Sequence, residues 1–163
     1  RSDLLRAALA GAPALQTPFN PDQWLDNQLR TVARLISIRQ QVGMRRQLFF
    51  VELGNWDTHS NHLQQHGQQL AELGSSLFNF QRTLQELGVE NSVTTFTFSE
   101  FNRTLTINGD GTDHAWAGDQ IVMGGAVDGA KVHGTPIQYT AQGIGTHWGD
   151  TLFGPYDTGA GRF

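Results

Sequence analysis

The stretch LFFVELGNWDTHSNH, residues 48–62, carries the strongest fold signal in the chain. Its apolar run stops abruptly at Gly54, and a short apolar run bounded by glycine is typical of a strand that is buried on both faces. Asp57 and His59 follow directly after this predicted strand. Because open α/β sheets bind ligands outside the carboxyl ends of their strands, the pattern places a carboxylate and an imidazole where such a fold carries out chemistry.

A second β-rich run, SVTTFTFSEF over residues 92–101, also ends in a carboxylate, Glu100. Asp113 and His114 come soon afterwards, in the segment GDGTDHAW. Two strand ends and one loop thus bring acidic and imidazole side chains to one edge of the predicted sheet. We interpret these side chains as half of a metal centre, with the candidate ligands Asp57, His59, Glu100, Asp113 and His114.

Apolar periodicity predicts how helices and strands alternate. It predicts a short helix over residues 3–10, a second over about 22–43, and a long one over about 60–87, whose leucines form one buried stripe. The expected strands are Leu48–Leu53, Val93–Phe98, Gln120–Val127 and, more weakly, Pro136–Thr140. Strands separated by a helix favour a right-handed crossover in a parallel sheet. We therefore expect a single α/β domain over residues 1–163, with glycine-rich loops from residue 102 onward.

Composition narrows the classes of partner. The chain has 163 residues and a formal net charge of −4, so it lacks the basic surface that general affinity for nucleic acid requires. No apolar run approaches the ~18 residues of a membrane-spanning helix. Without cysteine, any metal must be held by oxygen and imidazole, which suits Zn, Mn, Mg or Ca. The chain opens with Arg1 instead of Met, which we interpret as a processed chain or an internal fragment of a longer one.

The candidate ligands also have purely structural explanations. Asp57 could form an Asx turn or cap the helix that follows it. Glu100 could serve only as a hydrogen-bond acceptor for Arg103, which follows three residues later. These alternatives stay open at the level of the sequence.

The remaining histidines are interpreted as structural. His62 and His66 have the i, i+4 spacing of a helical metal pair, but His66 falls near the predicted apolar stripe, which favours a structural role. His133 and His147 lie in glycine-rich sequence without a partner at ligand spacing. We therefore treat both as ordinary loop residues.

The segments NWDTHSNH, TFSEFNRT and NGDGTDHAW, followed by IVMGGAVDGAKVHGTPI, resemble in order the signature of the domain-of-unknown-function family number 1501. The similarity covers residues 48 to about 137. That family is related to the alkaline phosphatase and sulfatase superfamily. The resemblance therefore implies a three-layer α/β sandwich with a mostly parallel sheet, a two-metal site at the strand ends, and a periplasmic or secreted location.

Carried over to this sequence, the resemblance implies that Asp57 and His59 bind a first metal and that His114 corresponds to the superfamily's late histidine. Glu100 takes the place of an acidic ligand, but Phe101 stands where the second-metal pair would continue. The superfamily's nucleophile comes from an N-terminal strand, and no such strand is predicted before residue 48. We therefore expect the chain alone to have little activity.

The sequence thus favours a metal-dependent hydrolase-like domain for a phosphate or sulfate ester, with a divalent ion such as Zn, Mn or Ca. Arg103 is the candidate anion clamp, because a guanidinium pairs well with such groups. The alternative is a non-catalytic binding or structural subunit, which packs against a protein partner or the remainder of a longer chain. Its candidate contact residues are the aromatics Trp116, Trp148, Phe153 and Tyr156.

Overall fold

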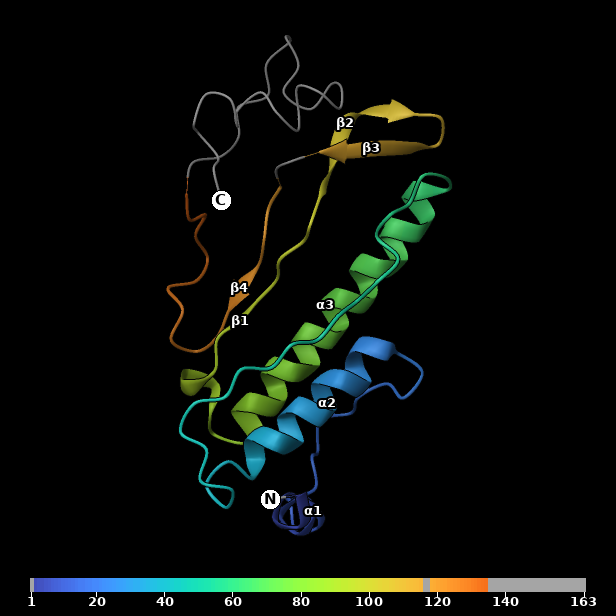
Figure 1. The fold of residues 1–163 in the computed structure, drawn as a ribbon. Helices are drawn as coiled ribbons and strands as arrows, with labels where there is room; N and C mark the ends of the chain where they lie inside the picture. Colours follow the sequence, from blue (N-terminus) through green and yellow to red (C-terminus); the bar gives the residue numbers. More distant parts are fainter. Residues whose placement is uncertain (1, 116–117, 135–163) are drawn as a thin grey trace. The chain divides into compact units, whose positions relative to one another are not determined.

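The computed structural model describes residues 2–115 and 118–134 (Figure 1). These residues divide into two compact units. The described part of the first unit comprises residues 2–54, 68–94 and 124–126. That of the second unit comprises residues 55–67, 95–115, 118–123 and 127–134. Helix α3 (His62–Glu86) begins in the second unit and continues in the first.

The first unit is built around two helices that lie side by side (Figure 1). α1 (Ser2–Ala10) is short, and α2 (Trp24–Ser37) packs against α3 through apolar residues spaced three and four apart. The core residues are Leu25, Leu29, Val32, Ala33, Ile36, Phe80, Leu84 and Val89. The three predicted helices are thus present, although the second ends at Ser37, before the predicted end at Gly43.

The apolar stripe predicted for the long helix is buried only in its second half. Leu84 is fully buried, whereas Leu63, in the first turn, is 89 % exposed. The helix stops as expected at Gly88, which has a φ of +64°, and the N–H of Val89 returns to the carbonyl of Leu84 at 2.9 Å. None of the described helices combines the length and apolarity needed to cross a bilayer.

The predicted three-layer sandwich with a mostly parallel sheet is wrong for the residues that the structure describes. Both sheets found there are two-stranded and antiparallel. β1 (Thr95–Phe96) pairs with β4 (Val122–Met123), and β2 (Asn102–Asn108) pairs with β3 (Gly111–Ala115). The strands expected over residues 93–98 and 120–127 thus shrink to two residues each and run in opposite directions. The strand expected over residues 136–140 lies outside the described residues.

Residues 48–53 are extended but belong to neither sheet, although the sequence predicted a strand buried on both faces. Their alternate side chains pack on the core of the first unit, and these are Phe49, Val51 and Leu53. On the other face Leu48 is 92 % exposed and Phe50 is 74 % exposed. A continuous apolar run is buried on both faces only if a layer covers each face, and in the described part of this unit the core covers one.

A hairpin occupies most of the segment that was predicted to be an irregular loop. β2 and β3 pair through Asn108 and Gly111, which leaves Gly109 and Asp110 as a two-residue turn. Gly109 has a φ of +69° and stands at the first central position, where type II′ hairpin turns carry glycine. The glycines that suggested a loop are therefore the residues that close the hairpin.

Candidate metal centre

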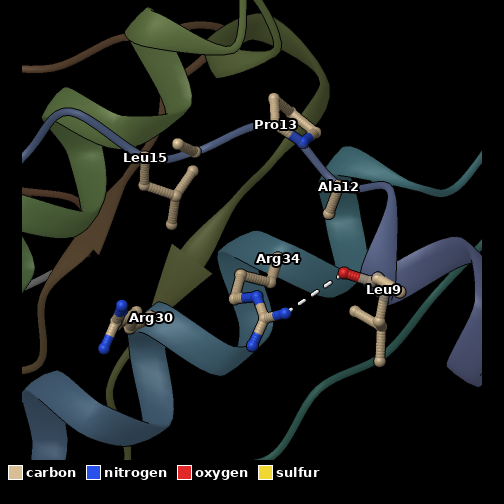
Figure 2. Close-up of a pocket in the computed structure, with 8 residues that line it drawn as sticks. Leu9, Ala12, Pro13, Leu15, Arg30 and Arg34 are labelled. Atoms are coloured by element: carbon tan, nitrogen blue, oxygen red, sulfur yellow. Dashed lines mark hydrogen bonds between the residues drawn. The ribbon is translucent and has the colours of Figure 1, made fainter.

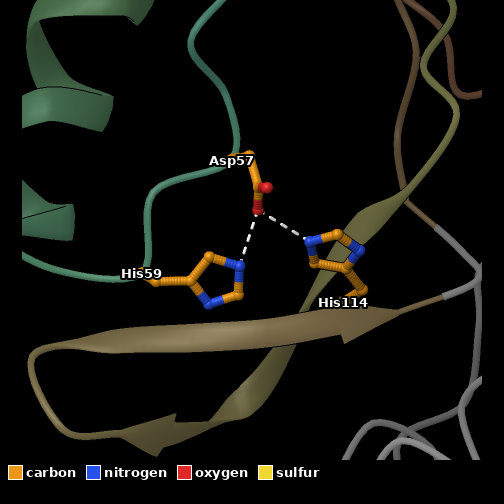
Figure 3. A group of neighbouring side chains, drawn as sticks. All are labelled: Asp57, His59 and His114. Atoms are coloured by element: carbon orange, nitrogen blue, oxygen red, sulfur yellow. Dashed lines mark hydrogen bonds and ion pairs between the residues drawn. The ribbon is translucent and has the colours of Figure 1, made fainter.

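Three of the predicted ligands meet in the second unit (Figure 3). The Nε2 atoms of His59 and His114 each lie 2.7 Å from Oδ1 of Asp57. The ligand atoms of all three residues lie within 4.8 Å of one another, and the two imidazole rings stack with centroids 5.4 Å apart. A loop and a hairpin strand, far apart in the sequence, thus bring one carboxylate and two imidazoles to a single point.

A close contact at the hairpin turn sets the position of the His59 loop. A Cβ on Gly111 would lie 2.7 Å from the backbone carbon and oxygen of His59, so only glycine allows this approach. The next residue back, Asp110, accepts the N–H of His62 on its carbonyl at 3.1 Å and the N–H of Asn61 on its carboxylate at 2.9 Å. Because these donors open α3, the turn also supplies negative charge to the helix N-terminus.

Arg103 ties Asp57 to the hairpin. Its Nη2 donates to the carbonyl of Trp56 at 2.7 Å and to Oδ1 of Asp57 at 3.2 Å, and its Nη1 donates to the carbonyl of Thr112 at 2.8 Å. The side chain is largely buried. These contacts hold the carboxylate of the candidate ligand Asp57 in place, and the anion clamp suggested by the sequence stays a prediction.

The electrostatic surroundings keep Asp57 ionised. The hydrogen bond from His114 is the main cause that lowers the pKa of Asp57 below its ordinary value. Positive charge on His59, His114 and Arg103 lowers the pKa further, while partial desolvation acts in the opposite direction. The carboxylate is therefore in the charged form that metal coordination requires.

The donor set fits a divalent ion such as zinc. Ligand bonds of ~2.0–2.2 Å place neighbouring ligand atoms of a tetrahedral site roughly 3.4 Å apart. The 2.7 Å contacts found here would therefore open by less than about 1 Å to admit an ion. The side chains of Asp57, His59 and His114 are 57 %, 56 % and 35 % exposed, so water or substrate would be able to reach a bound ion, as catalytic zinc sites require.

Two predicted ligands lie outside this group. Asp113 precedes His114 in β3, and adjacent residues of a strand point to opposite faces. Its carboxylate instead accepts a hydrogen bond from Nδ2 of Asn108 at 2.9 Å. Glu100 is exposed in the bend before β2, and its carboxylate does not join the group formed within the described residues.

Phe101 has an orienting role that the sequence reasoning missed. Its ring lies parallel to that of His114, with centroids 4.0 Å apart and planes 2° from parallel. The guanidinium carbon of Arg103 lies 5.1 Å from the same ring. In the sequence, Phe101 was noted only as a position where a metal ligand is missing. Its contact with Arg103 could have been predicted from their i, i+2 spacing, because such residues of an extended chain lie on the same face.

The first unit contains a cavity of about 410 Å³ (Figure 2). Unlike the Asp57 group, this cavity is not lined by residues that bind metal. The residues labelled around it are Leu9, Ala12, Pro13, Leu15, Arg30 and Arg34. Nη2 of Arg34 donates to the carbonyl of Leu9 at 3.2 Å. The lining residues include no carboxylate, imidazole or hydroxyl, so the cavity offers apolar walls and positive charge but neither a metal ligand nor a nucleophile.

Comparison with known protein families assigns the chain to one of them. Residues 12–143 match the family described as "Protein of unknown function (DUF1501)". Comparison with curated proteins and with solved structures gives no match. The matched range includes the loop that carries Asp57 and His59 and the strand that carries His114. Because the match covers most of the chain and confirms the resemblance drawn from its motifs, the protein belongs to the DUF1501 family.

Proposed function

We propose that this chain is the metal-binding part of a metal-dependent hydrolase that acts on a phosphate or sulfate ester. The observation that supports this function is the convergence of Asp57, His59 and His114 on one solvent-accessible point. The proposal rests on these side chains alone, and the three-layer fold implied by the family resemblance has no part in it.

The charge of the group favours an anionic substrate. One carboxylate supplies a single negative charge, so a divalent ion bound by it and by two imidazoles would keep net positive charge, to which the guanidinium of Arg103 adds. A bound ion would polarise an ester oxygen and lower the pKa of a coordinated water. Asp57, His59 and His114 would hold the ion, while Arg103 and Phe101 keep the ligands in place.

The runner-up function is a non-catalytic binding or structural subunit. Its candidate contact residues lie outside the described residues, and these are Trp116, Trp148, Phe153 and Tyr156. No contact in the structure therefore favours it over a hydrolase. A periplasmic or secreted location, which the resemblance implies, also stays a prediction.

Metal titration is the first test. The chelator-treated chain, titrated calorimetrically with Zn²⁺ or Mn²⁺, should show one strong site. Outer-shell substitutions cost metal sites ~10–100-fold in affinity, so loss of a direct ligand in Asp57→Asn, His59→Ala or His114→Ala should cost about 100-fold or more. The matched controls Asp113→Asn and His133→Ala should bind as wild type does. Absence of a strong site, or equal loss in the controls, would refute the metal centre.

Turnover is the second test. Aryl phosphate and aryl sulfate are offered to the metal-loaded chain and to His114→Ala. We expect slow turnover at most, because no nucleophile-bearing strand is predicted before residue 48, and any turnover should require both the metal and His114. Turnover that survives a chelator and the substitution would contradict the proposal. Metal binding without turnover of either ester would favour the binding or structural subunit.

A further inference from the structure

A second imidazole cluster lies in the second unit, where α3 begins. The rings of His62 and His66 stack with centroids 4.9 Å apart and planes at 21°. The indole of Trp56 meets His66 edge-on at 5.3 Å. The hydroxyl of Thr58 lies 2.5 Å from Nδ1 of His62. None of these residues belongs to the Asp57 group.

We propose that His62 and His66 form a second metal site, which takes Cu²⁺, Ni²⁺ or Zn²⁺ through two imidazole nitrogens. Residues i and i+4 lie on the same face of a helix, and histidines at this spacing can share one ion. Imidazole suits these transition metals, whereas Ca²⁺ and Mg²⁺ prefer oxygen ligands. The His62–His66 site should therefore bind transition metals and exclude Ca²⁺ and Mg²⁺. The Asp57 group contains a carboxylate oxygen and should exclude Ca²⁺ and Mg²⁺ less strictly.

Thr58 supplies the orienting contact that metal-binding histidines require. Such a histidine usually donates its other ring N–H to a neighbouring acceptor, which selects the tautomer and the ring orientation. In the tautomer in which Nδ1–H of His62 donates to the Thr58 hydroxyl, Nε2 keeps the lone pair that binds metal. Thr58 is itself buried, and its N–H donates to the carbonyl of Trp56 at 3.0 Å, so the acceptor is held in place.

The surroundings of His66 set the strength of the site. His66 is partly buried, and Arg103 lies close enough to interact with it electrostatically. The charge of Arg103 also repels a bound cation, and the cluster contains no carboxylate, so this site should bind more weakly than the Asp57 group.

Trp56 gives the experiment a local reporter, because Ni²⁺ and Cu²⁺ quench the fluorescence of a nearby indole. The titration uses the full chain carrying Asp57→Asn, in which the first group has lost its carboxylate. We expect saturable quenching by Ni²⁺ and none by Ca²⁺ or Mg²⁺. Adding Trp56→Phe should remove most of the quenching while calorimetry still detects the ion.

Variants in the same Asp57→Asn chain identify the ligands. His62→Gln or His66→Gln, which removes a direct ligand, should lower the Ni²⁺ affinity by about 100-fold or more, and Thr58→Val by ~10–100-fold, as expected for an outer-shell partner. His133→Gln is the matched control and should change nothing. Circular dichroism confirms that each variant is folded. Wild-type Ni²⁺ affinity in a folded His66→Gln variant, or the absence of Ni²⁺ binding in the parent chain, would overturn the proposal. Because Asp57 is already replaced, neither result bears on the ester hydrolase function.

Discussion

Single carboxylates join segments that are far apart in the sequence. Oδ1 of Asp57 lies within hydrogen-bond distance of two imidazoles and a guanidinium. Glu86 accepts the N–H groups of Gln16 and Thr17 at 2.7 and 3.0 Å, and also the Thr17 hydroxyl at 2.9 Å. Asp110 accepts two N–H groups at the start of α3. His59 lies only two residues from Asp57, but His114 and Arg103 reach it from a distant hairpin. Gln16 and Thr17 likewise reach Glu86 from a distant segment. Local spacing in the sequence does not reveal these long-range contacts.

Replacing Glu86 tests such a contact through pH. The hydrogen bond from the N–H of Gln16 is the main cause that lowers the pKa of Glu86 below its ordinary value of 4.5. A lowered pKa in the folded state stabilises the fold above the unfolded pKa, and this stabilisation is lost as pH falls through the folded value. Glu86→Gln should therefore lower the free energy of unfolding at pH 7, by under about 1 kcal/mol because the side chain is exposed. In urea unfolding the difference should shrink as pH falls below 4.5; a difference independent of pH would assign the effect to packing.

At the scale of elements, the β2–β3 hairpin supports the candidate metal centre. It carries His114 on β3 and Arg103 on the facing strand, and the two residues are register partners. Its turn contacts the His59 loop through Gly111 and caps α3 through Asp110. An antiparallel pair whose register shifts between Arg103 and Ile107 thus carries His114 and Arg103 and contacts the loop that carries His59.

A methyl group at Gly111 should disturb this arrangement. Gly111→Ala would place a Cβ 2.7 Å from the backbone of His59, so the loop must shift and the Zn²⁺ affinity should drop at least about tenfold, the lower end for outer-shell changes. Calorimetry measures the affinity, and amide spectra show whether the hairpin persists. The matched control is Gly74→Ala on α3, where nothing lies within 4 Å of the new Cβ. It should stabilise the fold by ~1 kcal/mol and leave the affinity unchanged. Wild-type affinity in Gly111→Ala would show that this contact does not hold the loop.

At the scale of the whole molecule, the stability of the first unit comes from one cluster of apolar side chains. α2, α3 and the extended residues 48–53 all contribute to it. Leu84 is fully buried there, whereas Leu63 of the same predicted stripe is exposed in the described part of the second unit. The sequence gives the two leucines the same role, and the structure gives them different ones.

Truncating these leucines separates the two roles. Leu84→Ala should cost ~2–5 kcal/mol in the free energy of unfolding, because it removes buried methyl groups and leaves a cavity. Leu63→Ala should stay within about 0.5 kcal/mol of wild type, as is usual for exposed positions. Chemical denaturation measures both. A large loss in Leu63→Ala would show that this end of the stripe is covered in solution.

Much of the local structure could be predicted from the sequence, and so could all three residues of the candidate metal centre. The helices follow from apolar spacing, and Gly88 marks the end of α3 by a positive φ that glycine adopts readily. Asp57, His59 and His114 were candidate ligands because of their neighbours in the chain, and the structure brings them together. Metal binding by this group stays a prediction. Glu100 and Asp113 were candidates on the same grounds, and sequence spacing could not separate them from the others.

What the sequence by itself determined is local: helical periodicity, glycine punctuation, the family motifs and the kinds of ligand available. Only the tertiary structure decided which strands pair. Backbone hydrogen bonds join antiparallel strands whatever their side chains, so the residues of one strand do not identify the strand that it pairs with. The hairpin between β2 and β3 then determined that His114 faces Asp57 while Asp113 points away, since a strand alternates its side chains. The apolar residues 48–53 were predicted to be buried on both faces, but one face is exposed. Burial depends on what covers each face of a strand, which is set by tertiary packing and not by residue type.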